Sequence, residues 1–261
     1  MTLRISVITV TLNSERFLEE CLASVAVQGE SLHEHIIVDG GSTDSTLEII
    51  KKHATADSRV RWISEPDRGI SDAMNKGVAL STGEVITHLN SDDYYPHQLV
   101  LSTVIDSFSR NPAEMWLTGG LTFISEDGAF IRDFRARRYS YRRLVRGNIL
   151  LHPSTFIKRD LFNEVGGFDV SLMFCMDYHL YLRLGSVTPP LMVDKQLSCF
   201  RVHNNSRSVS NSKQAYAEEF KVRMDYLHSK GRSTIFYRLD HLIKLCLNGF
   251  VYRRLLSANR I

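Results

Sequence analysis

Short apolar runs and helical apolar spacings take turns along the first hundred residues. Runs rich in β-branched residues predict buried strands at residues 4–12, 35–41 and 59–64, and from residue 84 onward. Between them, apolar side chains recur every three or four residues, which predicts helices over residues 14–26, 42–53 and 69–81. Strands and helices that alternate in this way are typical of a doubly wound α/β fold around a parallel central sheet.

The pattern changes after residue 97. Residues 98–110 have a helical spacing, and two apolar runs at 115–125 and 129–136 flank "EDG", as the strands of a β-hairpin flank its turn. A helix is predicted again over 176–185, and a strand over 196–203. This second half therefore predicts a mixture of strands and helices without the regular alternation of the first.

We predict one domain over residues 1–212, with halves of about 1–96 and 97–212, followed by a helical extension over 213–261. The extension holds ten Lys and Arg against four Asp and Glu and so carries +6, which leaves −3 on the rest of the chain. Its stretch 235–256 is strongly amphipathic. The basic extension is thus separate from the part of the chain that carries the candidate chemistry.

Composition excludes several classes of protein. The chain is 43% apolar and 23% charged, as in ordinary globular proteins, and no run of about 18 apolar residues predicts a membrane span. The spacings of its four cysteines fit neither a metal site nor a redox motif, which indicates reduced thiols in a cytoplasmic protein. Neither G-x-G-x-x-G nor G-x-x-x-x-G-K-[ST] follows an early strand, which argues against a nicotinamide dehydrogenase and a P-loop kinase.

Polar side chains gather where three of the predicted strands end, at Thr11–Asn13, Asp39–Ser42 and Asn90–Asp93. Ligands of doubly wound sheets bind beyond the carboxyl ends of the strands. Because these ends meet at one edge of the sheet, we expect the three clusters to form a single site.

Adjacent carboxylates repel each other, yet Asp92 and Asp93 stand side by side at the end of a buried strand. A divalent cation would cancel this charge, since Mg²⁺ and Mn²⁺ are held by one or two carboxylates together with substrate phosphates. The alternative is a solvated turn ahead of a helix. Asp39 can accept hydrogen bonds from a nucleobase or a ribose; its alternative is a helix-capping turn with Ser42.

Five stretches, in order over residues 3–205, resemble family 2 glycosyltransferases with the GT-A fold, and most of all the bacterial members that build surface polysaccharides. They are "ISVITVTLNSERFLEECLASVAVQ", "IIVDGGSTDST", "EPDRGISDAMNKGVALSTGEVITHLNSDDYY", "HPSTFIKRDLFNEVGGFD" and "MDYHLYLRL". The resemblance implies a Rossmann-like, mostly parallel sheet flanked by helices. It also implies a half that binds a nucleotide sugar and a half that binds the acceptor.

Carried over by position, the resemblance implies nucleotide contacts from Thr11, Asn13, Asp39, Arg68, Asn90 and Asp92. It implies that Asp92 holds Mn²⁺ or Mg²⁺, with Asp93 as a second candidate and His203 near the metal or diphosphate. Asp177 falls where the family has its catalytic base, and His152 can line the acceptor site. Two positions depart from the family pattern: Asn90 stands for the usual first Asp, and Met176 for the Glu before the base.

The expected reaction is an inverting transfer of a hexose from a UDP-sugar to a glycan acceptor carried on a polyprenyl diphosphate. Seven Arg against one Asp in residues 132–146, together with the basic extension, could rest on anionic lipid at the inner face of the cytoplasmic membrane. The alternative for the extension is a helix packed on the domain or in a dimer. No nucleic-acid partner is expected, because no recognised motif accompanies the basic segment.

Two other functions fit the sequence less well. A sugar nucleotidyltransferase would need a Gly-rich basic loop after the first strand, and "TVTLNSERF" has none. A non-catalytic partner that binds a nucleotide sugar or glycan within a synthesis complex is the alternative from another class, and the intact Asp177 argues against it.

Overall fold

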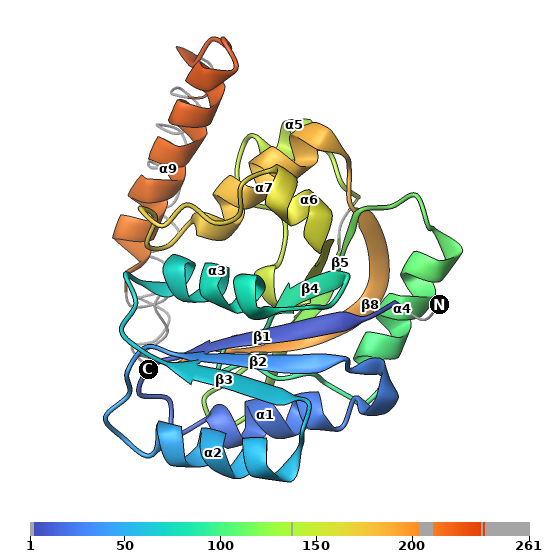
Figure 1. The fold of residues 1–261 in the computed structure, drawn as a ribbon. Coiled ribbons are helices and arrows are strands. Elements are labelled where there is room, and N and C mark those ends of the chain that lie inside the picture. The colour runs from blue at the N-terminus through green and yellow to red at the C-terminus, as the bar shows by residue number, and fades with distance from the viewer. Residues whose placement is uncertain (1–2, 137, 204–210, 236, 238–261) are drawn as a thin grey trace, which may run out of the picture.

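Eight strands form one mixed sheet in a computed structural model that describes residues 3–136, 138–203, 211–235 and 237 (Figure 1). The strands are β1 (Ile5–Thr11), β2 (Glu34–Asp39), β3 (Val60–Ser64), β4 (Val85–His88), β5 (Trp116–Ile124), β6 (Phe130–Phe134), β7 (Thr155–Lys158) and β8 (Leu191–Arg201). Their order across the sheet is β3-β2-β1-β4-β7-β5-β6, and β8 pairs with β5. The predicted α/β fold, with helices flanking a central sheet, is confirmed.

The first four strands run parallel, with β1 between β2 and β4 and β3 outside β2. The connecting helices are α1 (Leu18–Ala26), α2 (Thr46–Ala56) and α3 (Ile70–Leu80), and α4 (Val100–Arg110) follows β4. Successive side chains of β1 point to opposite faces. Val7 therefore packs in a core cluster with α1 and α4, whereas Ile8 packs in another with α3. In Figure 1, α1 and α2 cover one face of the sheet and α3 the other.

The second half of the sheet is mostly antiparallel. β7 pairs antiparallel with both β4 and β5, and the predicted hairpin is present as the antiparallel pair of β5 and β6. β8 runs parallel to β5. This half also contains α5 (Tyr141–Leu144), α6 (Arg159–Glu164), α7 (Met176–Val187) and a short 3₁₀ turn, His152–Ser154; a second 3₁₀ turn, Gly29–Ser31, lies in the first half, between α1 and β2.

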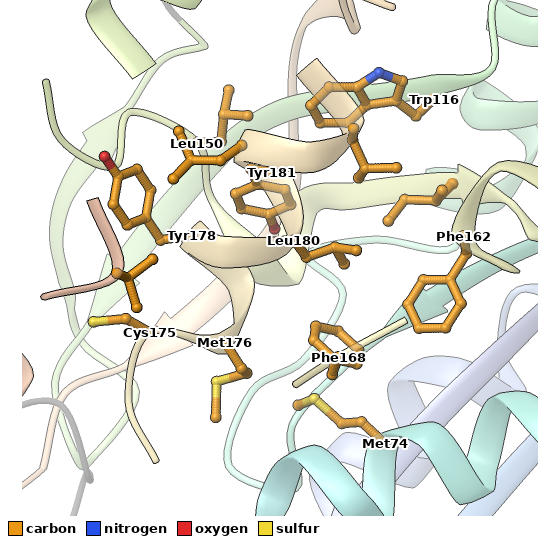
Figure 2. Packing of buried hydrophobic residues seen from close by; sticks show 14 of the residues in the cluster. Met74, Trp116, Leu150, Phe162, Phe168, Cys175, Met176, Tyr178, Leu180 and Tyr181 are labelled. Atoms are coloured by element: carbon orange, nitrogen blue, oxygen red, sulfur yellow. The ribbon is translucent and has the colours of Figure 1, made fainter. Parts of the chain in front are cut away.

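Aromatic packing fixes α7 against the sheet (Figure 2). The ring of Tyr181 stacks on Trp116 of β5 with centroids 5.9 Å apart, and the Trp116 indole N–H donates to the Thr188 carbonyl at 3.0 Å. Phe162 and Phe168 pack edge to face at 5.3 Å in the same cluster. Because such rings bury large areas in a defined geometry, they hold α7 in a fixed place against β5.

One predicted helix begins later than expected, and another lies mostly outside the described residues. The helix expected from Ser14 begins only at Leu18, because Asn13 takes a left-handed conformation (φ 50°) and Ser14 forms a turn with Phe17 and Leu18. The amphipathic stretch 235–256 lies almost wholly outside the described residues. Before it, α9 (Ser212–Ser229) projects away from the sheet in Figure 1. Within the described parts of the chain, no helix has the length and apolar character needed to cross a membrane.

Candidate active site

A pocket of about 520 Å³ opens at the carboxyl ends of the parallel strands. Many of the predicted site residues line it, namely Thr11, Asn13, Asn90, Asp92, His152, Asp177 and His203. They come from the end of β1 and the loop after it, from the loops after β4 and β8, from the turn before β7 and from the start of α7. The expectation that the strand ends share one site therefore holds for β1 and β4, and residues from the second half of the chain close the pocket.

Asn13 joins the ends of β1 and β2 on one side of the pocket. The side-chain oxygen of Asn13 accepts from the Thr43 backbone N–H at 2.9 Å, and the backbone N–H of Asn13 donates to Ser42 Oγ at 2.8 Å. Asn tolerates the left-handed backbone found here better than most residues. Thr11 Oγ1 is buried and has no hydrogen-bond partner among the described residues, so it can bind a ligand group.

The structure does not bring Asp39 and Arg68 into the pocket lining. The Asp39 carboxylate is buried and accepts hydrogen bonds from Ser64 Oγ at 2.6 Å, from Ser42 Oγ and from two backbone N–H groups. The Arg68 side chain is 76% exposed and pairs with Asp72 at 3.0 Å. Asp67 lines the pocket instead. The sequence analysis did not single out Asp67, although "EPDRG" directly follows the third predicted strand and so places polar side chains at a strand end, as in the other three clusters.

Asp92 and His203 form the pair that best fits a metal. Asp92 Oδ2 and His203 Nε2 lie 2.9 Å apart in the pocket wall. Beside them, Asn90 Oδ1 is buried without a hydrogen-bond partner among the described residues. No cluster of three or more His, Cys, Asp or Glu side chains converges anywhere in the described chain. A hard cation held here would thus take few protein ligands and draw the rest from substrate phosphates and water, as Mg²⁺ commonly does.

Asp93 is placed differently from its neighbour. It is buried outside the pocket lining, and its two oxygens accept from Arg201 N at 3.1 Å and from Asn90 Nδ2 at 3.2 Å. Burial and the adjacent charge of Asp92 raise the pKa of Asp93 well above its usual range. These contacts favour Asp92 over Asp93 as the residue that faces a metal.

Arg201, which the sequence did not single out, holds this loop from the end of β8. Its guanidinium packs over the Phe17 ring at 4.7 Å, and Nε donates to the Asp92 carbonyl at 3.2 Å. It also pairs with Glu20 and donates to the Glu126 carbonyl at 2.9 Å. One buried arginine side chain therefore links the backbone of Asp92 to the end of β8, two residues before His203.

Asp177 lies in the first turn of α7 and faces the pocket. Oδ1 accepts from its neighbour Tyr178 N at 2.7 Å, and Oδ2 accepts from Asn148 Nδ2 at 3.0 Å. Burial raises the pKa of Asp177 to about 6, and the charge of Glu219 acts in the same direction. A carboxylate with a pKa this close to neutrality is a stronger proton acceptor than an ordinary Asp and is still ionised at pH 7.

His152 contributes a neutral imidazole to the pocket. Its ring stacks on His88 at 5.6 Å and packs edge to face on Phe168 at 5.9 Å, and burial lowers its pKa to about 4. Its Nε2 is buried and has no hydrogen-bond partner among the described residues. This nitrogen can bind a hydroxyl group of a ligand.

Comparison with known sequences identifies relatives for most of the chain. The sequence model described as Glycosyl transferase family 2 matches residues 6–166. Chondroitin synthase of Escherichia coli is 29% identical over 220 residues, which cover 84% of this chain and 32% of that protein, so the chain spans about a third of this relative. A PGL/p-HBAD biosynthesis glycosyltransferase of Mycobacterium bovis (strain BCG / Pasteur 1173P2) is 28% identical over 260 residues, or 98% of this chain and 97% of that protein.

Solved structures share the fold. S. aureus TarS 1–349 in complex with UDP-GlcNAc matches with a TM-score of 0.66 and 19% identity, over 86% of this chain and 66% of that chain. The mannosyltransferase PcManGT from Pyrobaculum calidifontis, in complex with GDP-Man and Mn²⁺, matches with a TM-score of 0.61 and 17% identity, over 99% and 80% of the two chains. At these identities the likeness establishes the fold.

Proposed function

Because the chain belongs to glycosyl transferase family 2, we propose that it transfers a hexose from a nucleotide sugar, such as a UDP-sugar, to a hydroxyl group of a glycan acceptor with inversion at the anomeric carbon. The observation that carries this proposal is one pocket lined both by the Asp92–His203 pair and by Asp177, a carboxylate with a raised pKa. The Asp92–His203 pair would serve the leaving diphosphate, and Asp177 would serve the attacking alcohol.

Asn13, Thr11 and Asn90 supply the polar groups for the nucleotide side of the pocket. Thr11 Oγ1 and Asn90 Oδ1 are buried with no hydrogen-bond partner among the described residues, so a ribose hydroxyl would satisfy them at little cost in lost protein contacts. Asp67 adds a carboxylate on the same wall. Asp39 would support the nucleotide side of the pocket by holding the loop at Ser42 through hydrogen bonds. A direct contact between Asp39 and a nucleobase would require those bonds to rearrange.

Asp92 and His203 are the residues that would hold Mn²⁺ or Mg²⁺. When bound, the cation offsets negative charge on the diphosphate and acts as a Lewis acid. The protein's part is to present the Asp92 carboxylate and the His203 imidazole together. Arg201, two residues before His203, contributes by donating from Nε to the Asp92 carbonyl and from its backbone N–H to the Asp93 carboxylate. The TarS and PcManGT structures contain UDP-GlcNAc, and GDP-Man with Mn²⁺, which supports a nucleotide sugar and a metal here.

Asp177 would act as the general base. The acceptor hydroxyl must lose its proton as its oxygen attacks the anomeric carbon, and a carboxylate within hydrogen-bond reach can take that proton. Asn148 and Tyr178 N hold the two oxygens and so fix the orientation of the carboxylate. The neutral His152 can hold another hydroxyl of the same sugar, because its Nε2 has no other hydrogen-bond partner among the described residues.

A membrane surface is the proposed location of a lipid-linked acceptor. Phe130 and Ile131 of the edge strand β6 are 67% and 48% exposed, and the arginines that follow on residues 132–146 are exposed wherever the structure describes them, as on Arg142 and Arg143. Apolar side chains beside a cluster of arginines suit the interface of an anionic bilayer. This surface supports a peripheral attachment to the cytoplasmic face of the membrane.

A donor screen tests the proposed function. UDP-, GDP- and dTDP-sugars are added to the purified protein with Mn²⁺ or Mg²⁺, and binding is measured by calorimetry with and without EDTA. We expect one nucleotide class to bind only in the presence of metal. If no nucleotide sugar binds to the folded protein, the transferase proposal fails and a non-catalytic partner in a synthesis complex becomes the better hypothesis.

A further inference from the structure

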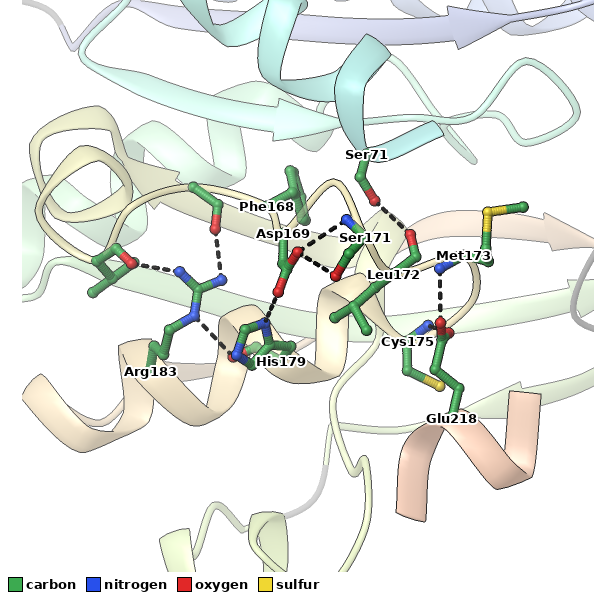
Figure 3. Close-up of polar contacts among 12 residues, drawn as sticks. Ser71, Phe168, Asp169, Ser171, Leu172, Met173, Cys175, His179, Arg183 and Glu218 are labelled. Atoms are coloured by element: carbon green, nitrogen blue, oxygen red, sulfur yellow. Dashed lines mark hydrogen bonds and ion pairs between the residues drawn. The ribbon is translucent and has the colours of Figure 1, made fainter. Parts of the chain in front are cut away.

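The carboxylate of Glu218 on α9 faces three consecutive backbone N–H groups from another part of the chain (Figure 3). Met173 N donates to Oε1 at 2.8 Å, and Phe174 N and Cys175 N donate to Oε2 at 2.6 and 2.9 Å. These residues directly precede α7, and the side chain of Cys175 at its N-cap makes no capping hydrogen bond. A helix N-terminus has unpaired N–H groups and favours negative charge. Glu218, 43 residues further along the chain than Cys175, supplies that charge.

The segment that Glu218 holds forms one wall of the pocket. Met173 and Phe174 line the pocket ahead of α7, and Asp177 lines it from the first turn of that helix. Asp177 is only two residues beyond Cys175, the last N–H that Glu218 binds. The position of the proposed base therefore depends on backbone that a side chain of α9 fixes.

The other end of the same segment is held by α3, independently of α9. Ser71 Oγ donates to the Leu172 carbonyl at 3.0 Å. The Asn75 amide accepts from Phe168 N at 3.0 Å and donates to the Phe168 carbonyl at 2.8 Å. Removal of the Glu218 carboxylate should therefore release the end next to α7, while α3 keeps the rest of the segment in place.

We propose that Glu218 is a positioning residue for glycosyl transfer, which fixes the backbone ahead of Asp177 and the pocket wall on the acceptor side. The inference rests on the proposed function, because it gives Glu218 a part in the same site. It also makes α9 a part of the active site, although the sequence predicted a separate extension from residue 213. Since a misplacement of about 1 Å can lower a rate about 100-fold, the loss of this contact should slow the reaction strongly.

The direct test is a titration of Asp177 in the full chain without substrate. The side-chain carbon of Asp177 is followed by ¹³C NMR from pH 3 to 8 in the wild type and in Glu218→Gln and Glu218→Ala, with Asp177→Asn to assign the signal. Burial holds the pKa of Asp177 at about 6, so a loosened segment that admits water should move it toward 3.8. The other groups that act on this carboxylate are the Tyr178 N–H, Asn148 and Glu219, and none of them is replaced in these variants. Cys175 and Tyr181, on whose pKa Asp177 acts, are also kept.

Graded variants separate positioning from charge. Gln keeps one acceptor oxygen at the same place, so Glu218→Gln should shift the titration less than Glu218→Ala. Two equal shifts would assign the effect to the lost charge alone and overturn the proposal, as would titrations that match the wild type. Glu48→Gln, an exposed carboxylate on α2, is the matched control and should leave the titration unchanged.

Turnover provides the second measurement. UDP release from UDP-GlcNAc with Mn²⁺, with water as acceptor, should fall about 10- to 100-fold in Glu218→Ala, while UDP affinity by calorimetry stays at the wild-type value. A loss of UDP affinity as large as the loss of turnover would mean general misfolding and overturn the proposal. If the wild type itself releases no UDP from any donor while the titration shifts as expected, the proposed reaction fails and the positioning of Asp177 by Glu218 stands.

Discussion

Replacing Asp177 with Asn removes the proposed base with little change of shape. Asn keeps one acceptor oxygen and so retains one of the two contacts of the carboxylate, which are Tyr178 N at 2.7 Å and Asn148 Nδ2 at 3.0 Å. General-base catalysis contributes a factor of about 10² to 10⁴, so transfer should fall by that amount. Binding of donor and metal should stay unchanged, because Asp92 and His203 lie on other elements.

The same substitution should stabilise the protein, and by an amount that depends on pH. Burial raises the pKa of Asp177 from 3.8 to about 6, so the folded protein holds the proton more tightly than the unfolded chain. At about 1.4 kcal/mol per pKa unit, the ionised carboxylate costs at most about 3 kcal/mol. Partial exposure of the side chain reduces this cost to about 1–2 kcal/mol. The cost is absent below about pH 4, grows between pH 4 and 6 and is complete above pH 6.

Urea unfolding of wild type and Asp177→Asn at several values from pH 4 to 8 measures this difference. The stability of the variant relative to wild type should rise by about 1–2 kcal/mol across the range, or a few degrees in Tm for a chain of this size. Asp160→Asn is the matched control, since Asp160 occupies the same second position of α6 but is exposed. Normal turnover of Asp177→Asn would refute its role as base, and a difference that is flat with pH would refute the burial argument.

Three further predictions follow from the site. Asp92→Ala should abolish the part of UDP affinity that wild type loses on addition of EDTA, as measured by calorimetry; an unchanged metal requirement would falsify the assignment of Asp92. The kcat/KM for transfer should fall below about pH 6 as Asp177 takes up a proton, and a plateau that extends to pH 4 would contradict this. The double variant Arg142→Glu, Arg143→Glu should bind vesicles of anionic lipid more weakly in co-sedimentation, by about 2 kcal/mol or more, since each arginine contributes about 1 kcal/mol. The control Lys51→Glu on α2 should bind like the wild type, and equal binding by the wild type, the double variant and the control would argue against this surface.

The sequence predicted best the side chains that gather where parallel strands end. Asn13, Asn90 and Asp92 converge because the carboxyl ends of parallel strands meet at one edge, a consequence of the fold alone. Asp39 and Arg68, predicted by the same logic, are not in the pocket lining. The carboxylate of Asp39 accepts hydrogen bonds from the loop that follows it, and the side chain of Arg68 is exposed to solvent. Neither orientation can be inferred from the position of the residue in the sequence.

The sequence did not predict contacts between residues far apart in the chain. Arg201 contacts Glu20, 181 positions away in the chain, and Glu218 of α9 contacts the backbone that precedes α7. The local pattern around each residue is that of an ordinary charged position. Their partners are backbone groups or distant carboxylates, so only the three-dimensional fold identifies them.

A crystal structure of the protein with UDP and Mn²⁺ would test whether this pocket binds the donor nucleotide and the metal. We expect nucleotide in the pocket, an anomalous manganese peak next to Asp92 and His203, and Asp177 on the sugar side. A manganese peak at Asp93, or nucleotide bound away from this pocket, would contradict the site proposed for glycosyl transfer.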